Sequence, residues 1–136
     1  MELKAGIIHE DDAAVRLGRA FSGSDEVDLI LVTGGLSVDP DDVTRKGIKK
    51  AGTKIKFYGT PILPGAMFLY GMLGGKPVLG LPACVFHPNA TLFDLIFPRI
   101  LAGETLTRRE INLLGHGGFC QNCHPCRFPV CPFGRG

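Results

Sequence analysis

Apolar and polar positions along the chain alternate between strand-like and helix-like spacing. Continuous or alternating apolar runs predict strands at Val27–Thr33, Lys54–Tyr58 and Pro77–Leu81, with a weaker one at Leu3–Ile8. Helical spacing predicts helices over 13–21, 40–51, 63–73 and 89–101. Strands that alternate with helices predict an α/β fold, in which a mostly parallel sheet lies between two helical layers as a three-layer α/β/α domain.

Composition limits the classes of partner. The chain has 136 residues, of which 45% are apolar and 21% charged, as expected of a globular protein. The net charge is +2 and the basic residues are scattered, which argues against a nucleic-acid partner. No run reaches the roughly 20 apolar residues that cross a bilayer, and no signal peptide is recognisable. We expect a cytoplasmic protein without a membrane partner, with an α/β domain over 1–103 and a linker and cysteine-rich tail over 104–136.

The tail carries four closely spaced cysteines, followed directly by Pro132. The spacing is C-x2-C-x2-C-x4-C, formed by Cys120, Cys123, Cys126 and Cys131. Four thiolates satisfy either a tetrahedral zinc ion or an iron–sulfur cluster, and a reducing compartment favours metal over disulfides. The run is close to the ferredoxin type, but the sequence leaves Zn²⁺ and [4Fe–4S] both open.

A second candidate site follows the central predicted strand, where Thr33-Gly34-Gly35 leads through Ser37 towards a helix. Ligands of open α/β sheets bind beyond the carboxyl ends of strands, and glycines allow a phosphate-bearing group close to the backbone. Asp39, Asp41 and Asp42 would repel a bare anion, so a phosphorylated ligand here would need Mg²⁺ as a bridge. The same residues also fit an ordinary helix start with Asp39 as the N-cap, Pro40 at N1 and Asp42 at N3.

Three segments resemble one protein family. DLILVTGGLSVDPDDVT is similar to the molybdopterin-binding domain of molybdenum-cofactor biosynthesis proteins, which include molybdotransferases and molybdopterin adenylyltransferases. The family's proline–glycine loop resembles Ile62–Ala66, which contains Pro64 and Gly65, and its Gly-Leu-Pro segment resembles Gly80–Pro82. The resemblance runs from about Asp28 to Gly103. Two features depart from it: Ala83-Cys84-Val85 replaces the family's Gly-Asn-Pro, and the segment before Asp28 is short.

The resemblance implies a ligand and a set of site residues. Molybdopterin or its nucleotide form would be held by Thr33, Gly34, Gly35, Ser37, Asp39, Pro64 and Gly65. Asp42 would be the catalytic residue and would position Mg²⁺. Two functions stay open: a molybdotransferase-like enzyme that inserts molybdenum or tungsten, and a non-catalytic module that binds or delivers the pterin and uses its cysteines for redox sensing or partner binding. A homo-oligomer and a molybdenum or tungsten enzyme as client are expected in either case.

Overall fold

The computed structural model describes residues 27–39, 42–86 and 89–136, so the predicted strand at Leu3–Ile8 and the helix over 13–21 lie outside the described residues. The strands and helices in chain order are β1 (Ile30–Thr33), α2 (Thr44–Lys50), β2 (Lys54–Tyr58), β3 (Leu69–Leu73), β4 (Lys76–Leu81), α3 (Leu92–Leu101) and α4 (Arg108–Leu113). Short 3-10 turns, η3 (Ala83–Phe86) and η4 (Leu114–Gly117), follow β4 and α4.

The four described strands form one mixed sheet with the order β1-β4-β3-β2. Only β1 and β4 are parallel, with Thr33 opposite Leu81 at their carboxyl ends. The β2–β3 and β3–β4 pairs are both antiparallel, so the prediction of a mostly parallel sheet is wrong for this part of the chain. The α/β class itself is confirmed.

The antiparallel pairing comes from a segment whose structure the sequence analysis predicted incorrectly. Residues 63–73 were expected to form a helix that ends at Gly74-Gly75, but Leu69–Leu73 is strand β3. Gly74 and Gly75 have φ values of +54° and +84° and join Leu73 to Lys76, its partner in the β3–β4 ladder. Two consecutive residues with positive φ suit a tight hairpin turn, which returns the chain beside itself instead of closing a helix.

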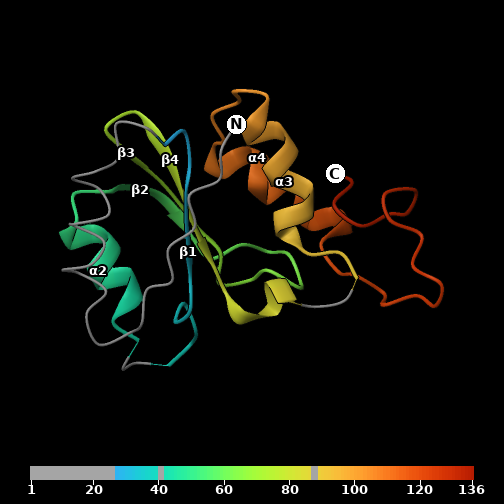
Figure 1. Ribbon diagram of the computed structural model, residues 1–136. Helices are drawn as coiled ribbons and strands as arrows, with labels where there is room; N and C mark the ends of the chain where they lie inside the picture. Colours follow the sequence, from blue (N-terminus) through green and yellow to red (C-terminus); the bar gives the residue numbers. More distant parts are fainter. Residues whose placement is uncertain (1–26, 40–41, 87–88) are drawn as a thin grey trace.

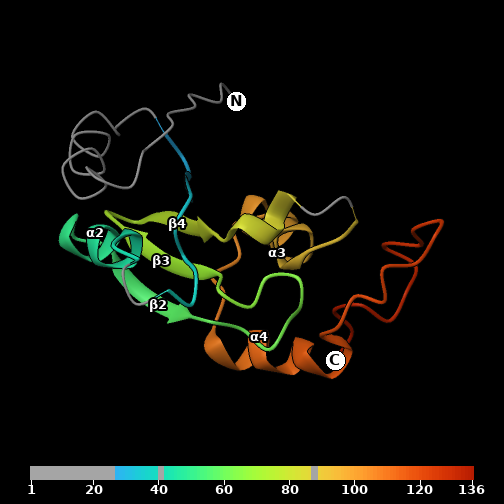
Figure 2. The same cartoon turned by 90° about the horizontal axis from the view of Figure 1, so that it is seen from below.

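Helices cover both faces of the sheet, as the predicted three layers require. Helix α2 packs on one face through Ile48, which belongs to a small core with Val32, Leu36, Leu69 and Val78. Helices α3 and α4 lie on the opposite face, as both views show (Figures 1 and 2). There they contribute to a larger core, whose fully buried members include Phe68, Leu79, Leu92, Ile96 and Ile111.

The C-terminal segment is part of this larger core. Leu106, Ile111 and Phe133 are buried in the same cluster as α3. The sequence predicted only a linker and tail over 104–136, yet this segment contains α4, whose first turn is closed by the Thr107–Glu110 capping box. Beyond α4 the cysteine-bearing segment, red in Figure 1, extends on the side of the molecule away from α2.

Helix α3 begins at a buried cap that can be tested directly. The Thr91 hydroxyl accepts a hydrogen bond from the Phe93 N–H at 3.2 Å and donates one to Asp94 at 3.0 Å, and Thr91 is 1% exposed. We expect Thr91→Ala to lower the free energy of unfolding by about 1–2 kcal/mol, because the cap is lost. Urea denaturation measures this, with the exposed Thr105→Ala as the matched control. Equal stability of the two variants would contradict the assignment.

Candidate functional site

The three family-like segments lie along one edge of the sheet. Because β1 and β4 are parallel, the turn after Thr33 and the segment after Leu81 leave the sheet at the same edge. Strand β3 begins there too, since Leu69 pairs with Gly80, and the Pro64-Gly65 loop directly precedes β3. Carboxyl ends of parallel strands are the usual location of ligand sites in α/β sheets. The topology therefore places all three segments at the expected edge.

The diglycine turn has an open side and a closed side. Gly34 and Gly35 have φ values of +90° and +62°, and Leu36 continues the left-handed backbone with +57°. A Cβ atom built on Gly34 would meet nothing within 4 Å, whereas one on Gly35 would lie 2.0 Å from the Thr44 Oγ1 atom. Leu36 is only 1% exposed and packs against Gly80 in the core beneath the turn. Gly34 therefore offers accessible backbone, while Gly35 and Leu36 anchor the turn.

Asp42 holds this loop together through its carboxylate. One oxygen, Oδ2, accepts the Ser37 N–H at 2.6 Å and is 3.4 Å from the Ser37 hydroxyl, and Oδ1 accepts the Thr44 N–H at 2.9 Å. The Ser37 hydroxyl also accepts the Asp39 N–H at 3.1 Å. Helix α2 begins at Thr44 after Val43, without the predicted side-chain cap from Asp39. The acidic loop is therefore organised around Asp42, and Pro40 lies outside the described residues.

Tyr58, which the sequence did not single out, contacts this loop, and Arg45 packs on Tyr58. The Tyr58 hydroxyl, at the end of β2, donates to the Ser37 carbonyl at 3.3 Å, and the Arg45 guanidinium lies over the Tyr58 ring, 4.9 Å from its centre. Burial raises the pKa of Tyr58, while Arg45 opposes this shift and Asp42 adds to it. Arg45 thus brings a cation to a loop rich in carboxylates.

A cavity of about 500 Å³, here called the sheet-edge pocket, lies beside the other two segments. Its lining comes from the loop before β3 (Leu63, Pro64, Ala66, Met67), from the segment after β4 (Pro82, Cys84), and from the tail (Phe119, Cys120, Asn122). Of the residues predicted to hold the pterin, only Pro64 lines it. Gly65 lies under Leu92, whose Cβ would be 2.5 Å from an added Cβ, and the residues of the diglycine turn are not part of its wall.

Backbone hydrogen bonds attach the tail to this pocket. The Leu63 N–H donates to the Gly118 carbonyl at 2.6 Å, and the Cys120 N–H donates to the Leu63 carbonyl at 2.8 Å. Cys84 lines the same pocket. Burial raises the pKa of its thiol, and a hydrogen bond with the Gly65 backbone opposes the shift. The thiols of Cys84 and Cys120 thus belong to one pocket, which the sequence alone did not indicate.

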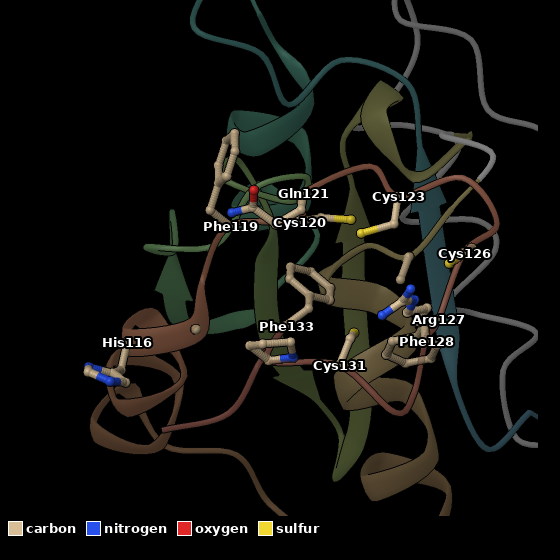
Figure 3. Close-up of a pocket in the computed structure, with 13 residues that line it drawn as sticks. His116, Phe119, Cys120, Gln121, Cys123, Cys126, Arg127, Phe128, Cys131 and Phe133 are labelled. Atoms are coloured by element: carbon tan, nitrogen blue, oxygen red, sulfur yellow. The ribbon is translucent and has the colours of Figure 1, made fainter.

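All four tail cysteines line a second cavity of about 380 Å³, here called the cysteine cavity. Figure 3 shows Cys120 and Cys123 pointing toward one another, with Cys131 approaching from the opposite side beside Phe133. Cys120 lines this cavity and the sheet-edge pocket alike. Within the described residues, no three His, Cys, Asp or Glu side chains are gathered closely enough to hold a single ion. The predicted ligands therefore share a cavity without converging on one point.

The layers and the strand ends define an α/β domain of the class that places its sites at the carboxyl ends of parallel strands. The chain belongs to the family described as "Probable molybdopterin binding domain", whose model matches residues 3–102. The match starts well upstream of Asp28, where the recognisable motifs begin. The family resemblance inferred from the sequence is thus confirmed.

The chain is also similar to individual proteins of molybdenum-cofactor biosynthesis. The chain is 29% identical over 96 residues to the molybdopterin molybdenumtransferase of Haemophilus influenzae. These residues make up 70% of this chain and 23% of that protein. The chain is also similar to the crystal structure of the molybdopterin biosynthesis MoeA protein from Pyrococcus horikoshii, with a TM-score of 0.50 and 28% identity over 67% of this chain and 22% of that one. The chain thus spans about a fifth of the length of these relatives.

Proposed function

We propose that the protein binds molybdopterin or its nucleotide form at this sheet edge and acts in molybdenum or tungsten cofactor biosynthesis or metal insertion. Family membership supports the ligand class. The observation that carries the proposal is the accessible backbone at Gly34, directly beyond a parallel strand end, next to a loop ordered by Asp42. A glycine with open space beside it lets a phosphate group approach the main chain closely.

Each predicted residue takes a defined part in this proposal. The exposed Thr33 hydroxyl and the Gly34 backbone would contact the pterin phosphate, while Gly35 and Ser37 maintain the loop. Asp42 is half-buried, and a carboxylate accepts more hydrogen bonds than the loop provides, so it could still reach Mg²⁺, with Asp39 beside it. Pro64 would line the neighbouring wall for the pterin ring, and Gly65 would let this loop pack closely against Leu92.

The hydrogen bonds of Asp42 are also compatible with the non-catalytic alternative. Both carboxylate oxygens of Asp42 already accept loop N–H groups, which explains this residue without any chemistry. A delivery module would bind pterin with no turnover, whereas a molybdotransferase-like enzyme would insert the metal with Asp42 positioning Mg²⁺. Incubation of the purified chain with molybdopterin, molybdate and Mg²⁺ distinguishes the two: cofactor formation selects the enzyme, and binding alone selects the module.

The proposal also includes the location of the protein, its oligomeric state, its client enzyme and the metal of the tail. We expect a cytoplasmic homo-oligomer whose client is a molybdenum or tungsten enzyme, with the pterin site in 1–103 and a metal, zinc or an iron–sulfur cluster, held by the tail in 104–136. No helix among the described ranges is long and apolar enough to cross a bilayer.

Gly34→Ala tests the ligand site. The added methyl group occupies the space that the proposed phosphate would need, so we expect molybdopterin affinity to fall about tenfold or more, equivalent to about 1.4 kcal/mol. Anaerobic titration followed by fluorescence measures affinity, and ligand-dependent thermal protection gives an independent readout.

Gly74→Ala is the matched control for this test. Gly74 also has positive φ and open space, but it lies in the β3–β4 turn, away from the carboxyl ends of β1 and β4. Both variants therefore place an L-residue at positive φ without a steric clash, and only Gly34→Ala should weaken binding. A wild-type protein that molybdopterin does not protect, or equal affinities of the two variants, would refute the site.

A further inference from the structure

We propose that the four tail cysteines bind a [4Fe–4S] cluster in the cysteine cavity and that the cluster lies against the sheet-edge pocket. The inference rests on the metal-binding tail proposed above and does not depend on pterin binding. It selects one of the two occupants that the cysteine spacing leaves open, and it does so from the shape of the cavity and the anchoring of its walls.

Hydrogen bonds and core packing anchor the backbone at the first and last cysteines, Cys120 and Cys131. Cys120 is half-buried, and its N–H is bonded to the Leu63 carbonyl on the sheet domain. Cys131 is also half-buried and precedes Phe133, a buried member of the main core, while the Gly134 N–H donates to the Gly117 carbonyl at 2.7 Å. Two of the four thiols are therefore positioned before any metal binds.

The two middle cysteines lie on the exposed loop between these anchors. Cys123 and Cys126 are solvent-exposed, yet both still line the cavity. Neither contributes to the core, so the loop can adjust its thiols to an occupant without disturbing the sheet domain. This combination of two rigid and two adaptable ligands suits a site that is completed when the metal is loaded.

The positions of the anchored cysteines favour a cluster over a single ion. A tetrahedral zinc site requires all four sulfur atoms about 2.3 Å from one point. Here the two anchored cysteines, Cys120 and Cys131, enter the cavity from opposite sides, so adjusting the loop with Cys123 and Cys126 would not by itself bring all four sulfur atoms to one point. An iron–sulfur cubane takes one thiolate at each iron and so places its ligands around a volume, and the C-x2-C-x2-C run is the spacing typical of such clusters.

The other lining residues fit an anionic, partly shielded cluster. Arg127 lines the cavity and would offset the negative charge of the thiolate-bound cluster. Phe119, Phe128 and Phe133 supply apolar surface, and Phe128 and Phe133 contact each other edge to face with ring centres 6.4 Å apart. Aromatic shielding and a nearby cation are among the features by which proteins stabilise and tune such clusters.

Cys120 lies between the proposed cluster and the sheet-edge pocket, because it lines both cavities. Its neighbour Phe119 does so as well. Cys84 also lines the sheet-edge pocket but is outside the cysteine cavity. A cluster bound through Cys120 would therefore be next to the wall of the pocket that the family motifs help to form.

Anaerobic reconstitution of the full chain with sulfide and equal amounts of ferrous and ferric iron tests the proposal, because the brown form of the cluster contains two of each. We expect about four iron and four sulfide per chain and a brown protein with the broad visible absorption of a [4Fe–4S] cluster. The double variant Cys123→Ser/Cys126→Ser should retain less than about a tenth of that iron, because only two thiolates remain. Its exposed positions leave the core intact, and circular dichroism should show an unchanged fold.

Cys84→Ser provides the matched control, since it removes a thiol beside the same pocket but outside the cysteine cavity, and it should load iron like the wild type. A colourless protein that binds stoichiometric zinc and no iron would refute the cluster, although the tail would still be a metal-binding site. Absence of both metals would overturn the tail proposal as well. Equal iron in the double variant and the wild type would show that the tail cysteines are not the ligands.

Discussion

Gly35→Ala is expected to lower the free energy of unfolding by about 2–5 kcal/mol. Forcing an L-residue into the left-handed backbone at φ +62° costs roughly 1–2 kcal/mol, and overpacking adds about 1–3 kcal/mol. The overlap is severe, because the new Cβ would lie 2.0 Å from the Thr44 Oγ1 atom and 2.7 Å from the Asp42 Oδ1 atom. The turn would have to open, which separates the strand end from the loop that Asp42 orders. Urea denaturation measures the change.

Gly34→Ala is the control that separates the steric clash at residue 35 from the backbone strain. The neighbouring glycine also has positive φ, but its added methyl group meets nothing within 4 Å, so only the strain of about 1–2 kcal/mol should appear. Gly35→Ala should therefore be the less stable variant by at least about 1 kcal/mol. Equal stabilities would mean that the turn relaxes freely around residue 35 and that its packing against Thr44 does not hold the loop.

Local patterns predicted the elements whose signals are short-range. Strand β2 occurs at Lys54–Tyr58 as expected, and helix α2 ends before Gly52, whose φ is +94°. The error at 63–73 arose because Gly-Gly is compatible with both a helix end and a tight hairpin. Only the pairing of Leu69–Leu73 with strands on both sides distinguishes the two, and that pairing is a long-range property.

The candidate site likewise combines features with a local sequence signal and features that depend on long-range contacts. Thr33-Gly34-Gly35 was recognisable because a strand end followed by glycines is a local signal. The Tyr58–Ser37 hydrogen bond spans 21 residues, and the tail meets the Leu63 loop through Gly118 and Cys120, so neither contact is encoded in a local motif. The shared position of Cys120 on two cavities likewise depends on how the tail crosses the sheet edge.

Asp42→Asn is expected to destabilise the loop and to weaken pterin binding together. The carboxylate accepts the Ser37 N–H at 2.6 Å through one oxygen and the Thr44 N–H at 2.9 Å through the other. An asparagine offers a single acceptor oxygen, so its NH2 group must face one of these N–H donors. A lost hydrogen bond with a donor left unsatisfied costs about 1–3 kcal/mol. Urea denaturation and anaerobic molybdopterin titration measure the two effects, and we expect affinity to fall about tenfold or more.

Asp28→Asn controls for the change in charge, because Asp28 is an exposed carboxylate that precedes β1 and takes no part in the loop. It should retain wild-type stability and affinity. If Asp42→Asn abolishes metal insertion by an otherwise active protein, and Mg²⁺ no longer increases its affinity for the pterin, Asp42 acts on the metal as well as on the loop. If wild type shows binding but no insertion, the loop role is the whole role of Asp42. An Asp42→Asn protein with unchanged stability and unchanged affinity would contradict both proposed roles of Asp42, in the loop and at the metal. The hydrogen bonds that order the turn would then have no measurable consequence.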